Sequence, residues 1–124
     1  MTRPGCQVSV VIPVFNGARF LGEALDSIRS QTWPPLEVIV VDDGSADESA
    51  SVASANGDVR LLRLPHRGVA AARNTGIEAS TGSLVAFLDQ DDVWLPEKLE
   101  KQVTLLDARL ELGFVICKER FFLE

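Results

Sequence analysis

An apolar run ends abruptly in acidic residues at Leu84-Val85-Ala86-Phe87-Leu88-Asp89-Gln90-Asp91-Asp92, and this segment says most about the architecture of the chain. Earlier in the chain, Val38-Ile39-Val40-Val41 ends in the same way at Asp42-Asp43-Gly44-Ser45. Short apolar runs bounded by turn residues are typical of strands that are buried on both faces of a sheet. Both acidic groups should therefore lie at the carboxyl ends of strands, where open α/β sheets bind their ligands.

The acidic groups also indicate what kind of ligand to expect. Like charges held this close together repel, and a hard divalent cation or an array of hydrogen-bond donors relieves the repulsion. We therefore expect a site for an anionic ligand that is chelated through a metal ion.

The rest of the chain alternates between strand and helix patterns. The predicted strands cover residues 8–14, 37–41, 59–64, 84–88 and 113–117, and the predicted helices cover residues 18–30, 45–55, 69–79 and a segment that begins near Pro96 and buries Leu99, Val103, Leu106 and Leu110. This alternation predicts an α/β fold with right-handed crossovers and a mostly parallel sheet flanked by helices, in a single domain over residues 1–124. The last pair, Leu123-Glu124, is consistent with a remnant of cloning.

Three local details complete the expected fold. Pro13 should end the ladder pairing of the first strand, since proline lacks an N–H group. Ser45 and Glu48 have the spacing of a capping box at a helix start. Trp94 and Leu95 are expected to pack beneath the acidic turn.

Composition narrows the class of protein. The chain has 124 residues, 46% of them hydrophobic, and a formal charge of -6, which argues against a nucleic-acid partner because no stripe of Lys and Arg is present. No apolar segment approaches the ~20 residues of a membrane span, and no secretory signal opens the chain. Cys6 and Cys117 lack metal-ligand spacing and fit a reducing compartment. We expect a cytoplasmic protein, with peripheral attachment to the inner membrane face in the full-length protein.

Five ordered motifs carry a family resemblance. They are VSVVIPVFN at 8–16, a helix ending in Ser30-Gln31-Thr32, VVDDGS at 40–45, GVAAARNTGIEASTG at 68–82 and FLDQDDVWLPEKLE at 87–100. Together, over roughly residues 7–101, they resemble the family 2 glycosyltransferases. The resemblance implies a Rossmann-like GT-A fold and inverting transfer of a sugar from a nucleotide-sugar donor, usually a UDP-sugar, to an acceptor that the sequence does not identify.

Residues after the first two strands are candidates for contact with the nucleoside. Pro13, Phe15 and Asn16 should edge the pocket, with a base against the Phe15 ring, although Phe15 could instead be the hydrophobic staple of the next helix. By resemblance, Asp43 accepts the ring N–H of uracil. Asp42 is open between a ligand contact and a turn or capping role with Gly44.

The segment Asp89-Gln90-Asp91 resembles the Asp-x-Asp element of the family. The resemblance implies that Mg²⁺ or Mn²⁺ bridges the turn to the pyrophosphate, with Asp91 as direct ligand and Asp89 on the donor ribose or the water shell of the metal. Asp92 would cap the turn. A purely solvated turn is the weaker alternative, because a turn gains nothing from three repelling acids.

Two basic side chains precede that turn. The resemblance places Arg73 opposite the donor phosphates, while the alternative is an exposed arginine on an Ala-rich helix. His66, the single histidine, is expected to be solvated or to pack, because no triad or metal set is nearby in the sequence. Asn74 and Gly76 should permit close helix packing or ligand approach.

The resemblance also implies a missing part. In this family the general base of inverting transfer comes from a region after the equivalent of Lys118, so the catalytic residue is expected beyond this chain. Residues 1–124 would then be the donor-binding portion of a GT-A domain, without appreciable turnover alone and prone to self-association through an exposed apolar face.

Two other classes of protein stay open at this point. A haloacid-dehalogenase-like phosphotransferase also carries Asp-x-Asp after a buried strand, although near its N-terminus. A non-catalytic nucleotide-binding or interaction module would need only the paired acids.

Overall fold

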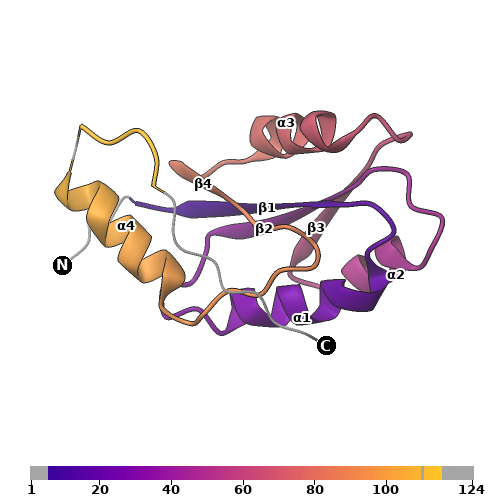
Figure 1. Ribbon diagram of the computed structural model, residues 1–124, viewed down its shortest axis with the longest axis horizontal. Coiled ribbons are helices and arrows are strands. Elements are labelled where there is room, and N and C mark those ends of the chain that lie inside the picture. The colour runs from indigo at the N-terminus through magenta and orange to yellow at the C-terminus, as the bar shows by residue number, and fades with distance from the viewer. Residues whose placement is uncertain (1–5, 110, 116–124) are drawn as a thin grey trace.

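The structure is a computed structural model that describes residues 6–109 and 111–115. Helices and strands alternate along the chain (Figure 1). In chain order the elements are β1 (Val8–Val14), α1 (Ala18–Arg29), β2 (Glu37–Asp42), α2 (Ser49–Ser54), β3 (Val59–Arg63), α3 (Val69–Ala79), β4 (Leu84–Phe87) and α4 (Lys98–Ala108). The predicted α/β class is confirmed.

The strands form one parallel sheet in the order β3-β2-β1-β4. The chain winds outward from β1 through β2 to β3 and then returns to the other side of β1 as β4. Two neighbouring strands that are wound in opposite directions in this way define the topological switch point of an open α/β sheet. Here that point lies between β1 and β4.

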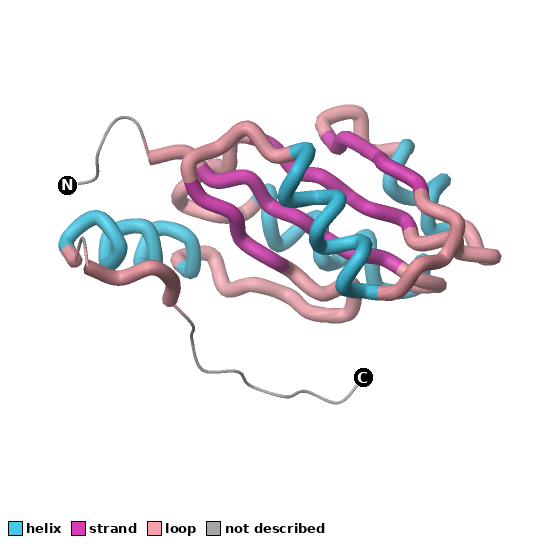
Figure 2. The backbone as a smooth tube through the Cα atoms, turned by 90° about the horizontal axis from the view of Figure 1, so that it is seen from above, coloured by secondary structure: helices cyan, strands magenta, loops and turns pink. Residues whose placement is uncertain are grey.

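Helices cover both faces of the sheet. In Figure 1, α3 lies above the strands, whereas α1 and α2 lie below them, and Figure 2 shows α3 crossing the sheet from above. Alternation along β1 separates two cores: Val10, Ile12 and Val14 pack with α1 and α4 residues, while Val11 packs with Ile39, Val41 and Ala72 under α3. The whole of β1 is buried, as expected for a strand covered on both faces.

Helix α3 can lie close to β1 because Gly76 has no side chain. A Cβ atom built at Gly76 would overlap the Val11 side chain. The expected close packing at Gly76 is therefore confirmed.

The amino ends of the strands are tied together by one carboxylate. Oε2 of Glu37, at the start of β2, accepts hydrogen bonds from Ser9 Oγ at 2.6 Å and from the N–H and Oγ1 of Thr81 at 2.6 and 2.9 Å. Burial alone would raise the pKa of Glu37, but these hydrogen bonds and the charge of Arg60 outweigh it, so the pKa lies below its ordinary value. This network joins β1, β2 and the turn before β4 at the end opposite the acidic groups.

The prediction for Pro13 is confirmed on the β4 side of β1, where pairing ends at Val11 and Phe87, and is wrong on the β2 side. β1 stays in register with β2 through Val14, with Pro13 opposite Val41. The backbone of Val8 and Val14 bonds toward β2, whereas Gln7 and Val11 accept bonds from Leu84 and Leu88 on the β4 side. Pro13 shares the parity of Val11, so its missing N–H faces the edge where β4 has already ended.

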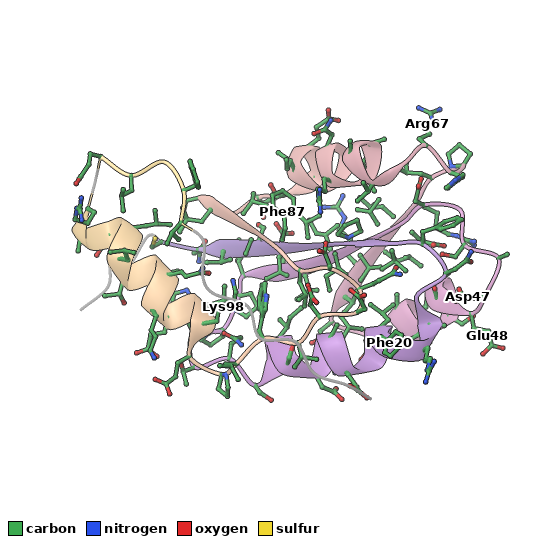
Figure 3. The ribbon with its side chains drawn as sticks, in the orientation of Figure 1. Phe20, Asp47, Glu48, Arg67, Phe87 and Lys98 are labelled. Atoms are coloured by element: carbon green, nitrogen blue, oxygen red, sulfur yellow. The ribbon has the colours of Figure 1, made fainter. Side chains whose placement is uncertain are left out.

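The capping box is also absent. Helix α2 starts at Ser49, its N-cap Glu48 makes no side-chain capping bond, and Ser45 instead bonds to the N–H of Asn16. Figure 3 shows the Glu48 side chain pointing away from the protein. Ser45 and Glu48 have the spacing of a capping box, but the Ser45 hydroxyl accepts the N–H of Asn16, which is distant in sequence.

The predictions near the carboxyl end are mixed. Trp94 is buried, but Leu95 is 72% exposed rather than packed. In α4, Leu99 and Val103 are buried and Leu106 is half-buried. Residues 113–115 form no strand, and Leu110, residues 116–117 of that predicted strand and Cys117 lie outside the described residues. Among the helices of the described chain, none combines the length and hydropathy needed to cross a bilayer.

Candidate functional site

A cleft of about 420 Å³ opens at the carboxyl ends of β1, β2 and β4, at the switch point of the sheet. The two acidic groups come together there, as expected for strands that end at one edge. Its lining residues are Pro13, Val14, Phe15, Asp43, His66, Gly68, Val69, Ala72, Arg73, Asp89, Gln90 and Asp91. Six of the seven candidate binding residues line the cleft, and Asn16 does not.

Asp43 is held in one orientation by the loop before α3. Its Oδ1 accepts the N–H of Arg67 at 2.6 Å, and its Oδ2 accepts the N–H of Gly68 at 2.9 Å. Nδ1 of His66 lies 3.2 Å from the same Oδ2 and 3.1 Å from the Asp43 carbonyl oxygen. A carboxylate has about four acceptor positions, so these contacts leave room for one further donor from a ligand.

The same contacts set the protonation state of Asp43. The residue is only 3% exposed, and burial would raise its pKa. The two backbone N–H groups and the neighbouring His66 outweigh that effect, so the pKa lies below its ordinary value. At neutral pH Asp43 is therefore ionised and can only accept hydrogen bonds.

Phe15 and His66 form an aromatic pair at the mouth of the cleft. Their ring centroids lie 4.3 Å apart with the planes 26° from parallel. Phe15 is 42% exposed, so it is not buried as a helix staple would be, and part of its ring faces solvent. The pair offers a flat apolar surface beside the acceptor Asp43.

Arg73 faces the acidic turn from α3. Its Nη2 lies 3.3 Å from Oδ1 of Asp89, and its guanidinium carbon lies 6.0 Å from the centre of the Phe87 ring. Figure 3 shows Phe87 between α3 and the strands. The Arg73 side chain is 42% exposed and lines the cleft, which leaves part of the guanidinium available to an anion.

The donor set of the turn fits a hard cation that shares its ligands with a phosphate. Asp89 and Asp91 both line the cleft and are exposed, and both offer the oxygen ligands that Mg²⁺ and Mn²⁺ prefer. Within residues 6–109 and 111–115, no group of three or more His, Cys, Asp or Glu side chains could enclose a metal ion. Such a pair of carboxylates suits Mg²⁺, which proteins bind through one or two carboxylates together with substrate phosphates.

Gln90 points back to the first strand. Its Oε1 accepts the N–H of Phe15 at 2.7 Å, and its Nε2 donates to the Phe15 carbonyl at 3.1 Å. A Cβ atom at Gly17 would lie 2.5 Å from Cδ of Gln90, so the glycine leaves space for this side chain. The acidic turn is thereby fastened to the loop after β1.

Asn16 organises a loop and does not line the cleft. Its Oδ1 accepts the N–H groups of Ala46 and Asp47, at 2.8 and 3.4 Å. In return, the loop after β2 and the first residue of α2 supply acceptors to the start of α1. The N–H groups of Asn16, Gly17 and Ala18 donate to Ser45 Oγ, Ser49 Oγ and Asp47 Oδ2, at 2.8, 2.9 and 3.1 Å. Figure 3 labels Asp47 in this region.

Asp42 and Asp92 have local partners. Asp42 is fully buried; its Oδ1 accepts the N–H of Ser45 at 3.2 Å, and its Oδ2 lies 3.4 Å from Nε of Arg63. This geometry matches the turn alternative for Asp42. The N–H of Asp92 closes the acidic turn on the Asp89 carbonyl at 3.0 Å.

The sequence did not indicate the contact of His66 with Asp43 or any role for Gln90. His66 was expected to be solvated or to pack; its side chain is 62% exposed and stacks on Phe15, and its Nδ1 also contacts Asp43. Its position two residues before Gly68 placed it near the start of α3, but its pairing depends on tertiary structure. For Gln90, the one signal was its place between two candidate ligands.

Comparison with known proteins identifies the relatives of this chain. Residues 9–119 match the family described as glycosyl transferase family 2. An uncharacterised glycosyltransferase of Rickettsia prowazekii (strain Madrid E) is 42% identical over 101 residues, which cover 81% of this chain and 32% of that protein. The chain thus spans about a third of the length of this curated relative.

Two solved structures show the same fold. The S. aureus TarS 1-349 structure in complex with UDP-GlcNAc superposes with a TM-score of 0.78 at 27% identity, covering 84% of this chain and 32% of that one. The mannosyltransferase PcManGT from Pyrobaculum calidifontis, in complex with GDP-Man and Mn²⁺, superposes with a TM-score of 0.75 at 33% identity, covering 86% and 34%. From the match over most of its length, the chain belongs to the family 2 glycosyltransferases.

Proposed function

We propose that residues 1–124 form the donor-binding portion of an inverting glycosyltransferase that binds a nucleotide-sugar, with a UDP-sugar as the expected donor. The observation that carries the proposal is the cleft in which Asp43, Arg73 and the acidic turn face one another. Relatives of the same fold were solved with UDP-GlcNAc, and with GDP-Man and Mn²⁺. Family membership displaces the haloacid-dehalogenase-like alternative, and no observation favours a non-catalytic module.

In this proposal Asp43 reads the base. An ionised carboxylate with one free acceptor position favours a ring N–H, which uracil and guanine carry and cytosine lacks. The base would lie against the exposed part of the Phe15 ring, and Pro13 would line the wall beside it. Cytosine would place a ring acceptor against the Asp43 carboxylate, which costs affinity.

The diphosphate would lie between Arg73 and the acidic turn. Arg73 would donate to phosphate oxygens, Asp91 would hold the cation, and Asp89 would contact the ribose or the water shell. A bound Mg²⁺ or Mn²⁺ supplies positive charge against the negative charge that grows on the departing nucleoside diphosphate. Without such a cation, the exposed carboxylates of the turn would repel the diphosphate.

We place the general base and the acceptor site in sequence that follows residue 124. The acceptor and the sugar are not assigned. Location in the cytoplasm, with peripheral attachment to the inner membrane face, and self-association stay predictions from the sequence.

Isothermal titration calorimetry tests the proposal. UDP should bind with Mn²⁺ and show no measurable binding without it, and Asp91→Asn should remove the effect of the metal. Asp58→Asn is the matched control, because Asp58 is exposed and lies outside the cleft, where it pairs with Arg29 at 3.5 Å. Equal UDP affinity with and without metal would contradict the proposal.

A panel of nucleotides tests the role of Asp43. UDP should bind about tenfold or more tightly than CDP, since an acceptor that meets an acceptor leaves a buried polar group unpaired. Asp43→Asn should narrow that difference, because an amide can also donate. If CDP binds as tightly as UDP, Asp43 does not recognise the base, and the proposal for the metal site is unaffected.

A further inference from the structure

The Gln90 side chain forms hydrogen bonds with Phe15, just beyond the point where the backbone of β4 stops pairing with β1. Along β1, the carbonyls of Gln7 and Val11 accept N–H groups from the β4 side. Phe15 lies four residues after Val11 on the same edge, beyond the end of β4 at Phe87. There the Gln90 amide accepts the N–H of Phe15 and donates to its carbonyl, the two bonds that two successive peptide groups of a neighbouring strand would otherwise make.

Few side chains could replace it. A carboxamide offers a donor and an acceptor together, whereas a carboxylate only accepts and a thioether does neither with any strength. Gly17 leaves the space that the Gln90 side chain fills. Two separate features, the paired hydrogen bonds and the missing Cβ, therefore fit this one amide.

Phe15 links Gln90 to the other half of the cleft. Its ring stacks on His66 at 4.3 Å, and Nδ1 of His66 lies 3.2 Å from Oδ2 of Asp43. Contacts thus run without a gap from the residue between Asp89 and Asp91 to the buried carboxylate Asp43. A change in the position of the acidic turn has a direct physical route to the base-reading side.

We propose that Gln90 is a positioning residue that fixes the acidic turn relative to Phe15 and thereby couples cation binding at Asp91 to nucleoside binding at Asp43. The inference rests on the proposed function, since it requires a cation and a nucleoside in this cleft. Both hydrogen bonds of its amide go to the Phe15 backbone. It acts through the Phe15 backbone.

Uridine is the probe that isolates this coupling, because it has no phosphate to bridge to the cation. Calorimetry on the 124-residue chain would measure the uridine Kd with and without saturating Mn²⁺. In the unmodified chain, Mn²⁺ should tighten uridine binding by about fivefold, at the low end of measured couplings between sites. In Gln90→Met that difference should vanish, while UDP still requires Mn²⁺ because its diphosphate meets the cation directly.

Two further variants separate positioning from stability. Gln90→Glu keeps an acceptor for the Phe15 N–H and should keep a reduced coupling, which provides a readout if Gln90→Met unfolds. Gln31 makes a similar pair of bonds outside the cleft, from Nε2 to the Leu95 carbonyl at 2.7 Å and from Leu99 N to Oε1 at 3.0 Å. Gln31→Met should therefore lower the melting temperature yet retain the uridine coupling.

The outcomes distinguish the two proposals. In the unmodified chain, UDP binding could require Mn²⁺ while the uridine Kd is the same with and without Mn²⁺. That result would overturn the proposed coupling but would leave the proposed function intact. Coupling that persists in Gln90→Met, or disappears equally in Gln31→Met, would also overturn the role of Gln90. UDP binding that is indifferent to metal would overturn both.

Discussion

The imidazole of His66 lies over the ring of Phe15 while its Nδ1 contacts Asp43, so one side chain supports both elements expected to hold a base. His66 also has a positive φ of 36°, a backbone conformation that few residues other than glycine, asparagine, aspartate and histidine adopt readily. A histidine therefore suits this position of the loop before α3 in two ways: it tolerates the positive φ, and its ring contacts both Phe15 and Asp43.

Replacing His66 should weaken nucleotide binding. His66→Ala removes the stacking partner that holds the Phe15 ring, worth about 0.5–1.5 kcal/mol for an aromatic pair. The ring would then have to be ordered as the nucleotide binds, which should raise the UDP Kd by roughly 2–10-fold. His66→Asn tolerates the positive φ but cannot stack, so it should weaken binding to a similar extent. Calorimetry with Mn²⁺ measures both, and an unchanged Kd in both variants would contradict a role for the aromatic pair.

Gly44 should not tolerate a side chain. Its φ of 79° favours glycine, and a Cβ atom there would lie 2.8 Å from the backbone nitrogen of His66. Gly44→Ala should lower the free energy of unfolding by about 1–3 kcal/mol. Gly57→Ala is the control, because no atom lies within 4 Å of a Cβ at that position. Urea denaturation compares the two, and equal midpoints would be incompatible with this account.

Two helical glycines should respond in opposite directions to the same substitution. Gly76→Ala in α3 forces a methyl group into Val11 and should destabilise the fold by about 1–3 kcal/mol. Gly22→Ala in α1 meets nothing within 4 Å and should stabilise it by about 0.5–1 kcal/mol through helix propensity. Thermal unfolding of the two variants tests whether the close approach of α3 to β1 determines the sign of the change in stability.

Glu37 should make stability depend on acid pH. Its pKa lies below the ordinary 4.5 in the folded protein, so the ionised form favours folding above that value, and this contribution is lost as pH falls through the folded pKa. Glu37→Gln should cost about 1–3 kcal/mol at pH 7, as hydrogen bonds to a charged group are lost, and progressively less below pH ~4.5. Chemical denaturation from pH 7 to pH 3 would measure the difference.

The control for Glu37 is Glu23→Gln, an exposed position on α1. It should leave the pH profile of stability unchanged. A Glu37→Gln difference that stays constant from pH 7 to pH 3 would show that charge is not the reason for its effect.

Sequence pattern was sufficient for the four strands of the sheet because local hydrophobic order and tertiary burial agree. Val8–Val14 is apolar apart from Ser9 and is buried throughout, and Val69–Ala79 begins and ends where predicted. Acidic residues after two such strands had to meet at one sheet edge, and Asp43 and Asp91 do line one cleft.

What the pattern could not supply was the choice of partner. Ser45 and Glu48 had the spacing of a cap, yet Ser45 bonds to Asn16, twenty-nine residues away. Pairing with β4 ends before Pro13 while pairing with β2 continues past it, because the missing N–H faces only the β4 side. His66 and Gln90 gained their roles from contacts with Phe15, which depend on how the strand ends are placed in space.

The start of α1 has one more consequence for a phosphate-containing ligand. In many α/β proteins the first free N–H groups of this helix bind phosphate. Here the N–H groups of Asn16, Gly17 and Ala18 are already bonded to Ser45, Ser49 and Asp47, and the last of these is an anion. These three N–H groups are therefore not available to a diphosphate, and under the proposed function its charge would have to be neutralised by Arg73 on α3 and by a metal ion.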